Sequence, residues 1–458
     1  MKKLLERWGF GMGGVAENSM QNTLPTLANP IFNVAFGVSP VLVGIAMSLP
    51  RFWEILLDPW IGTVSDNTAS SWGRRRPFII IGGVISAVLF AAIWWVPVGW
   101  SPEAKGWWLI VSAFLFYTAY SFFAVPYAAF ALEVTQDDGE RIQLMAARTA
   151  LANASAIGIN WLYWLTQLDW FSGTAQGIRW VGTAFAVVIG LAAIIPALIT
   201  REQRMETDRI TLPVAAPVPK ISVFASGWEL IKLRPLQWML ASMLLFIVGF
   251  TLVSHLGFYI LLYYAYHGDS QQVGLLSGVS GTITSIVAVL ICPLVAFAAN
   301  RIGKTKALMF FLAVGGIGSL SFWWSMNPHQ PYWVITSSVA VAFGLSAYWT
   351  TMPAFLGDIS DAYERKTGIV CQGLFTAIYG IAAKIGVSVS FLLTGYTLIF
   401  CRFDVKQTLE EMADPLTLMR VLFCIVPALG MALAAFSIWK CRPGEIAPMT
   451  RLDPQPSA

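Results

Sequence analysis

Long apolar stretches recur along the whole chain and constrain it more than any other feature. Each is long enough to cross about 30 Å of hydrocarbon as a helix. Their number predicts about twelve membrane-spanning helices. The stretches fall at residues 10–32, 39–64, 77–98, 107–131, 144–167, 179–199, 236–263, 272–299, 306–326, 331–357, 368–399 and 416–439.

The composition agrees with a chain that is largely surrounded by lipid. Hydrophobic residues make up 57% of the 458 residues and charged residues only 12%. Soluble domains carry about 25% charged residues. We therefore expect an all-α membrane protein whose partners include the lipid bilayer.

The distribution of Lys and Arg predicts the orientation of these spans. With the N-terminus in the cytoplasm, 21 of the 29 Lys and Arg residues fall in cytoplasmic segments. The external loops then hold only Lys105, Arg179, Arg402 and Lys406. We expect both termini in the cytoplasm and an even number of spans in the cell membrane, which is the inner membrane if the cell is Gram-negative. The basic N-terminus has no cleavage site after a short apolar region, so we expect no cleaved signal peptide.

A polar segment rich in Pro and charge divides the spans six and six. We expect an N-terminal six-helix bundle at 1–199, a cytoplasmic linker at 200–235, a C-terminal six-helix bundle at 236–440 and a cytoplasmic tail at 441–458. Glycine and basic residues follow span 2 at 72–76 and span 8 at 302–306, as a weak echo between the halves. Two six-helix halves related by a parallel repeat are typical of the major facilitator fold.

Several other classes of function are disfavoured. The five cysteines are scattered without CxxC spacing, and the three histidines form no HExxH motif, which argues against a disulfide framework or a zinc site. No combination of nucleophile and base appears, so we expect neither an enzyme nor a cofactor. The basic run at 72–77 is too short and too close to the membrane to bind nucleic acid.

Charges inside span 2 point to function, because ionisable groups at bilayer depth are costly. Glu54 and Asp58 are four residues apart and share a helix face with Arg51. Two carboxylates at this spacing suit Na⁺ through their hard oxygen ligands, or H⁺ through a shared proton. The alternative is that Arg51 and Glu54 form a purely structural ion pair.

Further polar residues are candidates for a solute pocket. Glu17, Asn18 and Gln21 share a face of span 1 and suit a hydroxyl-rich solute, or alternatively join span 1 to a neighbouring helix. Arg148, placed at the start of span 5, is either a pocket donor or an interfacial residue. Lys384 lies near the middle of span 11 and needs a partner or a substrate.

One aromatic residue completes the candidate pocket. Trp349 in span 10 could stack on a sugar ring, although with twenty tryptophans any single one is more often a packing or lipid-facing residue.

The sequence resembles the glycoside–pentoside–hexuronide:cation symporters, the family of melibiose permease. The family pattern Arg-x-Trp-Asp-x-x-x-Asp-Pro is matched at residues 51–59 with one Asp to Glu change, at Glu54. The resemblance continues at 71–77, at 357–361 and at 366–368, and covers nearly the whole chain. Lys384 and Trp349 stand at the family's spacing from Asp358.

The resemblance implies a symporter for a sugar or glycoside that is coupled to Na⁺ or H⁺. The cation site would then include Glu54 and Asp58, with Ser121 as a hydroxyl ligand and Lys384 between the cation and sugar sites. The galactoside-binding residues of the family are not reproduced, because their positions hold Ala16, Ala124 and Ala128 here.

We therefore expect a monomeric secondary active transporter that moves a small solute by alternating access. One alternative keeps the fold but changes the solute to a non-sugar or amphiphilic molecule. A second alternative is a sensor that does not transport, which the short polar segments disfavour.

Overall fold

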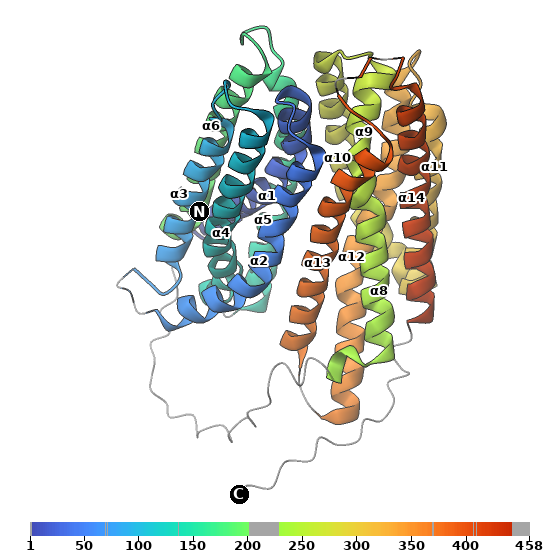
Figure 1. Cartoon of the computed structure of the whole chain (residues 1–458). Coiled ribbons are helices and arrows are strands. Elements are labelled where there is room, and N and C mark those ends of the chain that lie inside the picture. Colours follow the sequence, from blue (N-terminus) through green and yellow to red (C-terminus); the bar gives the residue numbers. More distant parts are fainter. Residues whose placement is uncertain are drawn as a thin grey trace, which may run out of the picture.

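The structure, a computed structural model, describes residues 2–441 except 69, 71, 136, 201–228, 369–370, 406 and 409. The described part of the chain is helical, and Figure 1 shows its helices as two bundles side by side. The first bundle contains α1 (Lys2–Ala28), η1 (Asn29–Ala35), α2 (Pro40–Asn67), α3 (Arg76–Trp94), α4 (Pro102–Val134), α5 (Asp138–Thr166) and α6 (Thr174–Ile199). The second contains α8 (Arg234–Ser254), α9 (Leu256–Tyr259), η2 (Ile260–Ala265), α10 (Ser270–Ile302), α11 (Lys304–Ser325), η3 (Pro331–Trp333), α12 (Val334–Thr367), α13 (Gln372–Phe400) and α14 (Ala413–Lys440).

Several helix boundaries differ from those expected. α12 continues to Thr367, ten residues beyond the expected end at 357. α3 stops at Trp94 rather than 98, since Pro97 disfavours helical geometry in the residue before it. α5 starts at Asp138, so Arg148 lies almost three turns inside the helix and not at its start. Most of the linker expected at 200–235, residues 201–228, lies outside the described residues, and α8 begins within the expected linker, at Arg234. The tail expected at 441–458 lies outside them except for residue 441.

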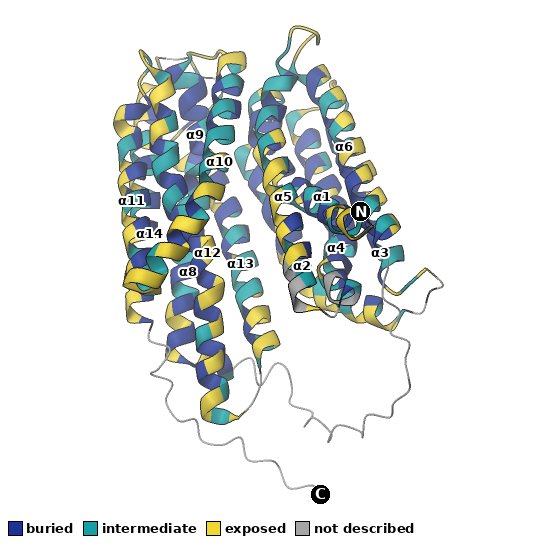
Figure 2. Cartoon of the chain, turned by 180° about the vertical axis from the view of Figure 1, so that it is seen from behind, coloured by how far each residue is buried: buried dark blue, intermediate teal, exposed yellow. Residues whose placement is uncertain are grey.

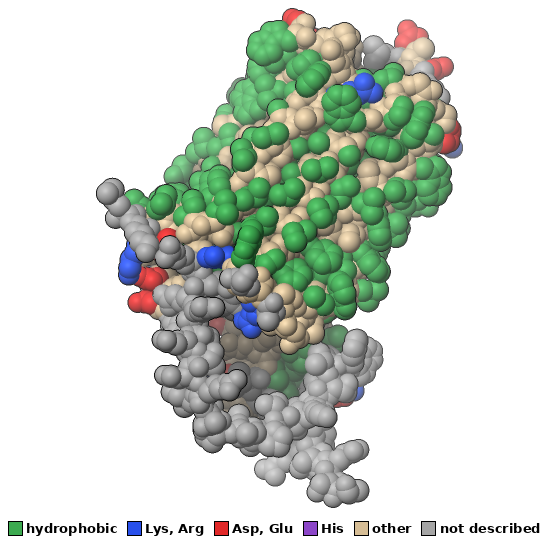
Figure 3. Space-filling view, turned by 90° about the vertical axis from the view of Figure 1, so that its left-hand side faces the viewer, with side chains coloured by type: hydrophobic (Ala, Val, Ile, Leu, Met, Phe, Trp, Pro, Cys, Tyr) green, Lys and Arg blue, Asp and Glu red, His purple; other side chains and the backbone are tan. Residues whose placement is uncertain are grey.

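Each bundle is held together by its own apolar core. One cluster of buried residues joins the helices of the first bundle and a second joins those of the other. Figure 2 shows buried positions turned into the bundles and exposed positions on their outer faces. Many exposed side chains are nevertheless apolar, and Figure 3 shows a broad hydrophobic face with charged side chains toward its edges. Such an exterior suits lipid and not water.

Within the described residues, ten helices are long and apolar enough to cross a membrane. α1 and α5 are equally long but fall outside this group. Both carry polar side chains along their middle turns, for example Glu17 and Asn18 in α1 and Arg148 in α5. These two helices pack against each other inside the first bundle. Some of the polar side chains of α1 and α5 therefore face the other helix and not lipid.

The two bundles meet tightly at one end, which Figure 1 draws at the top near α9. α2 packs on α13 and α5 packs on α10. A Cβ added at Gly395 would lie only 2.6 Å from the carbonyl oxygen of Pro40, and one added at Gly274 only 2.8 Å from the Cα atom of Trp164. Within the described part of the chain, nothing lies within 4 Å of a Cβ added at Gly373, near the other end of α13. The bundles are thus closed at one end and separated at the other.

A second echo between the halves appears only in the backbone. α1 runs into the π-helix η1, and the corresponding helix of the second half, α8, runs through α9 into the π-helix η2. Short π-helical segments are uncommon and often lie at functional positions. Both lie at the closed end, so the same local distortion marks the two bundles where they meet.

Candidate functional site

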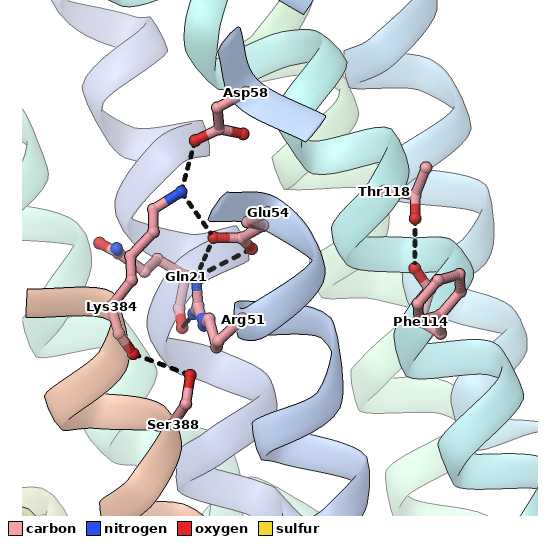
Figure 4. A network of polar contacts seen from close by, with 8 residues as sticks. All are labelled: Gln21, Arg51, Glu54, Asp58, Phe114, Thr118, Lys384 and Ser388. Carbon is pink, nitrogen blue, oxygen red and sulfur yellow. Dashed lines mark hydrogen bonds and ion pairs between the residues drawn. The ribbon is translucent and has the colours of Figure 1, made fainter. Parts of the chain in front are cut away.

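Three ionisable side chains of α2 lie together, as their helical spacing requires. Nη1 of Arg51 donates to both carboxylate oxygens of Glu54, at 3.2 Å and 3.3 Å. Asp58 lies one turn further along the helix (Figure 4). The two carboxylates therefore stand one above the other on the same face of α2.

Lys384 of α13 reaches this group from the other bundle (Figure 4). Its ammonium nitrogen lies 3.1 Å from Oε2 of Glu54 and also contacts Oδ2 of Asp58. Two positive and two negative side chains therefore form one group, which is neutral when all four are ionised. The ammonium occupies the space between the two carboxylates and ties α13 to α2.

Burial makes the partners of Glu54 necessary. Glu54 is 1% exposed and Arg51 is 5% exposed, and a buried ion that loses its partner destabilises a protein strongly. Arg51 also donates from Nη2 to the backbone carbonyl of Gln21 at 3.1 Å and lies 4.3 Å from the ring centroid of Tyr117. Arg51 thus joins α2 to α1 and α4. The structural ion pair and the contact of Glu54 with Lys384 are both present.

Asp58 has unused binding capacity. Its side chain is 28% exposed, and its Oδ1 atom is buried without a hydrogen-bond partner among the described residues. The hydroxyl of Ser121 is likewise buried without a partner within that part of the chain. The described residues contain no group of three or more His, Cys, Asp or Glu side chains that could hold a metal ion. Any cation bound here would depend on two carboxylates and neutral oxygens.

Two of the candidate pocket residues of α1 contact α5. Oε2 of Glu17 accepts from Nε of Arg148 at 3.0 Å, and the guanidinium of Arg148 lies 5.5 Å from the ring centroid of Tyr127. Asn18 donates to the carbonyl of Ala152 at 3.0 Å and to Oγ of Ser155 at 2.9 Å. These contacts are those expected if the polar patch joins span 1 to a neighbouring helix.

Gln21 and Trp349 both have exposed side chains. The backbone carbonyl of Gln21 binds Arg51, while its side chain is exposed. Trp349 of α12 is 49% exposed and contacts the rings of Phe246 and Tyr348 nearly at right angles. Its indole is therefore held in place without a parallel ring stacked on it.

Trp349 lines a cavity of about 550 Å³ between the bundles. Thr149 and Asn153 of α5 form its side in the first bundle. α8, α10, α12 and α13 form the opposite wall, which includes Phe250 and Cys292. Glu17, Asn18, Gln21, Arg148 and Lys384 are not among the residues that line it. The structure thus separates the candidate pocket residues. Glu17, Asn18 and Arg148 join α1 to α5, and Trp349 lines the cavity. Lys384 belongs to the charged group on α2 and α13, and the side chain of Gln21 is exposed.

Sequence reasoning missed most of this cavity. Thr149 and Asn153 are four residues apart on α5, next to Arg148, and that helical spacing was an available signal. No sequence signal marked the apolar cavity residues, because apolar residues are expected throughout a membrane span. These residues include Phe246, Phe250 and Cys292. Only their arrangement around a space distinguishes them.

A chain whose described part is helical, with many apolar spans, two bundles and a partly buried group of charges between them, has the features of a membrane transporter of the major facilitator type. The fold itself occurs in known structures. A crystal structure of the nucleoside transporter NupG is similar with a TM-score of 0.60 at 14% identity, covering 96% of this chain and 96% of that one. At that identity the likeness concerns the fold alone.

The chain belongs to the MFS/sugar transport protein family, whose model matches residues 9–442, and within it to the glycoside–pentoside–hexuronide type. The glucuronide carrier protein homolog of Escherichia coli (strain K12) is 24% identical, covering 94% of this chain and 91% of that one. The isoprimeverose transporter of Lactiplantibacillus pentosus is 21% identical, covering 98% and 90%. The protein is therefore a multi-pass membrane transporter of a symporter family, and not an enzyme.

Proposed function

We propose that this protein is a secondary active symporter that couples the inward movement of Na⁺ or H⁺ to that of a sugar or glycoside. The observation that carries the proposal is the position of Lys384. Its ammonium group, supplied by one bundle, lies between the carboxylates of Glu54 and Asp58 in the other. The related glucuronide carrier homolog and isoprimeverose transporter support a sugar-like solute by their names.

The arrangement suggests how the two substrates are coupled. An ammonium group and a coupling cation compete for the same two carboxylates, so a cation or proton that binds Glu54 and Asp58 displaces Lys384. Val387, one turn further along α13, lines the cavity that contains Trp349. Release of Lys384 would therefore allow α13 to move, and Val387 would change the shape of the cavity at the same time. Coupling of this kind is reciprocal and is typically worth about 1–3 kcal/mol.

We further propose that α1 and α5 also cross the membrane, which gives twelve spans with both termini in the cytoplasm. Their polar side chains are tolerable at bilayer depth because they are paired with each other, as Glu17 and Arg148 are. In this orientation the closed end faces outside, and the structure represents a state that is open to the cytoplasm. Localisation in the cell membrane follows from the same proposal.

The decisive test is uptake into proteoliposomes that contain the purified protein. Candidate monosaccharides, disaccharides, pentosides and uronides are offered with an inward Na⁺ gradient, an inward proton gradient or neither. We expect accumulation of at least one sugar or glycoside with one gradient and only equilibration without it. Equal uptake under all three conditions for every solute that enters would refute symport.

A further inference from the structure

The lining of the cavity beside Trp349 restricts the class of solute. Among the described residues, no Lys, Arg, Asp or Glu lines this cavity. The wall in the second bundle includes the apolar side chains of Phe246, Phe250, Val289 and Leu345. An ionised group placed against such a wall would lose its hydration without gaining a counter-charge. The cavity therefore favours an uncharged solute with an apolar part.

The aromatic part of this wall is prepared for a flat apolar group. Phe246 stacks on Tyr348 with ring centroids 3.7 Å apart and planes 12° apart, which fixes its position. Trp349 meets these two rings at 78° and 89°, and 49% of its surface is exposed. A ring or short hydrocarbon chain from the solute can therefore contact the indole without displacing another aromatic side chain.

The side of the cavity formed by α5 is different. Thr149 and Asn153 are exposed there and supply a hydroxyl and an amide, which can both donate and accept hydrogen bonds. The charges close by already have partners, since Arg148 is paired with Glu17 and Lys384 with Glu54. The α5 side of the cavity is neutral and polar, and the opposite wall is neutral and mostly apolar, with Thr251, Ser346 and Thr350 as its hydroxyl-bearing residues.

Building on the proposed symport, we propose that the solute is an uncharged glycoside with an apolar aglycone. Its sugar hydroxyls bind Thr149 and Asn153, and its aglycone lies against Phe250 and Trp349. The cavity volume of about 550 Å³ falls in the usual range for ligands that combine such parts. A free sugar could cover Trp349 but would leave Phe250 and the aliphatic part of the wall uncovered, and a uronide would bring a carboxylate for which the described lining residues include no cation.

Binding to the purified protein in nanodiscs tests this proposal directly. Methyl and phenyl glycosides of glucose, galactose and xylose are titrated calorimetrically, together with phenyl glucuronide. We expect the phenyl compound of at least one sugar to bind roughly tenfold or more tightly than its methyl partner, as burial of an aryl ring predicts. Phenyl glucuronide should bind more weakly than phenyl glucoside.

Cys292 provides a second readout, because its partly exposed thiol lies in the same cavity. A bound phenyl glycoside should slow alkylation of Cys292 by N-ethylmaleimide, measured on its peptide by mass spectrometry. Trp349→Ala should reduce the preference for phenyl over methyl. Trp324→Ala is the matched control, since Trp324 of α11 is 74% exposed and is not among the cavity residues, and it should leave the preference unchanged.

Equal affinity for phenyl and methyl glycosides would overturn the proposal, as would tightest binding of the glucuronide or no binding by any member of the panel. Gradient-driven uptake separates this result from the proposed function. Accumulation of free sugars without a preference for an aglycone would leave symport standing and remove the aglycone site. Protection of Cys292 by phenyl glycosides without gradient-driven uptake would leave the aglycone site standing and remove symport.

Discussion

Tyr259 donates its phenolic hydrogen to Oδ1 of Asn33 at 2.6 Å, and this bond joins the two bundles at their closed end. Both side chains are buried, and each belongs to or adjoins a π-helix. Asn33 in turn donates to the carbonyl of Val38 at 2.7 Å. The contact therefore links η1 of the first bundle to the segment next to η2 of the second. An alternating-access transporter must open at this place.

Removal of this bond should loosen the closed end. Tyr259→Phe keeps the ring and deletes the hydroxyl, leaving Asn33 with an unsatisfied acceptor. A buried hydrogen bond contributes about 1 kcal/mol, so opening should become several-fold more frequent. Hydrogen–deuterium exchange of segments 29–38 and 256–266 should accelerate. Tyr396→Phe, at an exposed position of α13, should leave exchange in both segments unchanged. Unaltered exchange in Tyr259→Phe would show that this bond does not hold the end closed.

Asp58→Asn should uncouple transport. The variant keeps the shape of the side chain and removes one of the two carboxylates that contact Lys384. We expect cation-driven accumulation of solute to be lost while exchange down a gradient persists, because the cavity is unchanged. Gradient-driven uptake and counterflow are compared at equal protein in the membrane, with Asp169→Asn in an exposed turn as the control. Undiminished accumulation by Asp58→Asn would remove the cation role from this carboxylate.

Lys384→Ala should make stability depend on the coupling cation. Without the ammonium group, Glu54 and Asp58 lie close together with only Arg51 as a described cationic partner. Loss of one partner of a buried pair destabilises by a few kcal/mol, less here because Lys384 is partly exposed. The melting temperature should fall in choline chloride and recover with Na⁺ or at lower pH. A melting temperature that neither condition raises more than in Lys306→Ala, an exposed control on α11, would contradict this expectation.

Asn18→Ala should separate the helix-joining group from the solute cavity. The variant deletes the two hydrogen bonds to Ala152 and Ser155, so we expect a stability loss of about 1 kcal/mol. Solute affinity should change by less than about twofold, because Asn18 does not line the cavity. Trp349→Ala should lower solute affinity and change stability little, as measured by binding assays and thermal unfolding. A large loss of affinity in Asn18→Ala would return this residue to the solute site.

Local features of the site were predictable from the sequence because helical periodicity is a local property. The period of 3.6 residues alone places Arg51, Glu54 and Asp58 on one face of α2. The same reasoning grouped Glu17 and Asn18, although the period could not decide whether they face a solute or α5. The apolar spans were equally predictable, since the length and hydropathy of a span depend only on residues that are adjacent in the sequence.

The tertiary structure decided which of these groups meet. Lys384 stands 326 residues after Asp58, and only the packing of α13 on α2 brings its ammonium group between the two carboxylates. The cavity joins neutral side chains from helices of both bundles, and apart from the spacing of Thr149 and Asn153 no periodic pattern marks them. The π-helices and the Tyr259–Asn33 bond depend on how the bundles meet. Sequence determined which faces are polar because that information lies within one or two turns, whereas the pairing of those faces depends on contacts between distant segments.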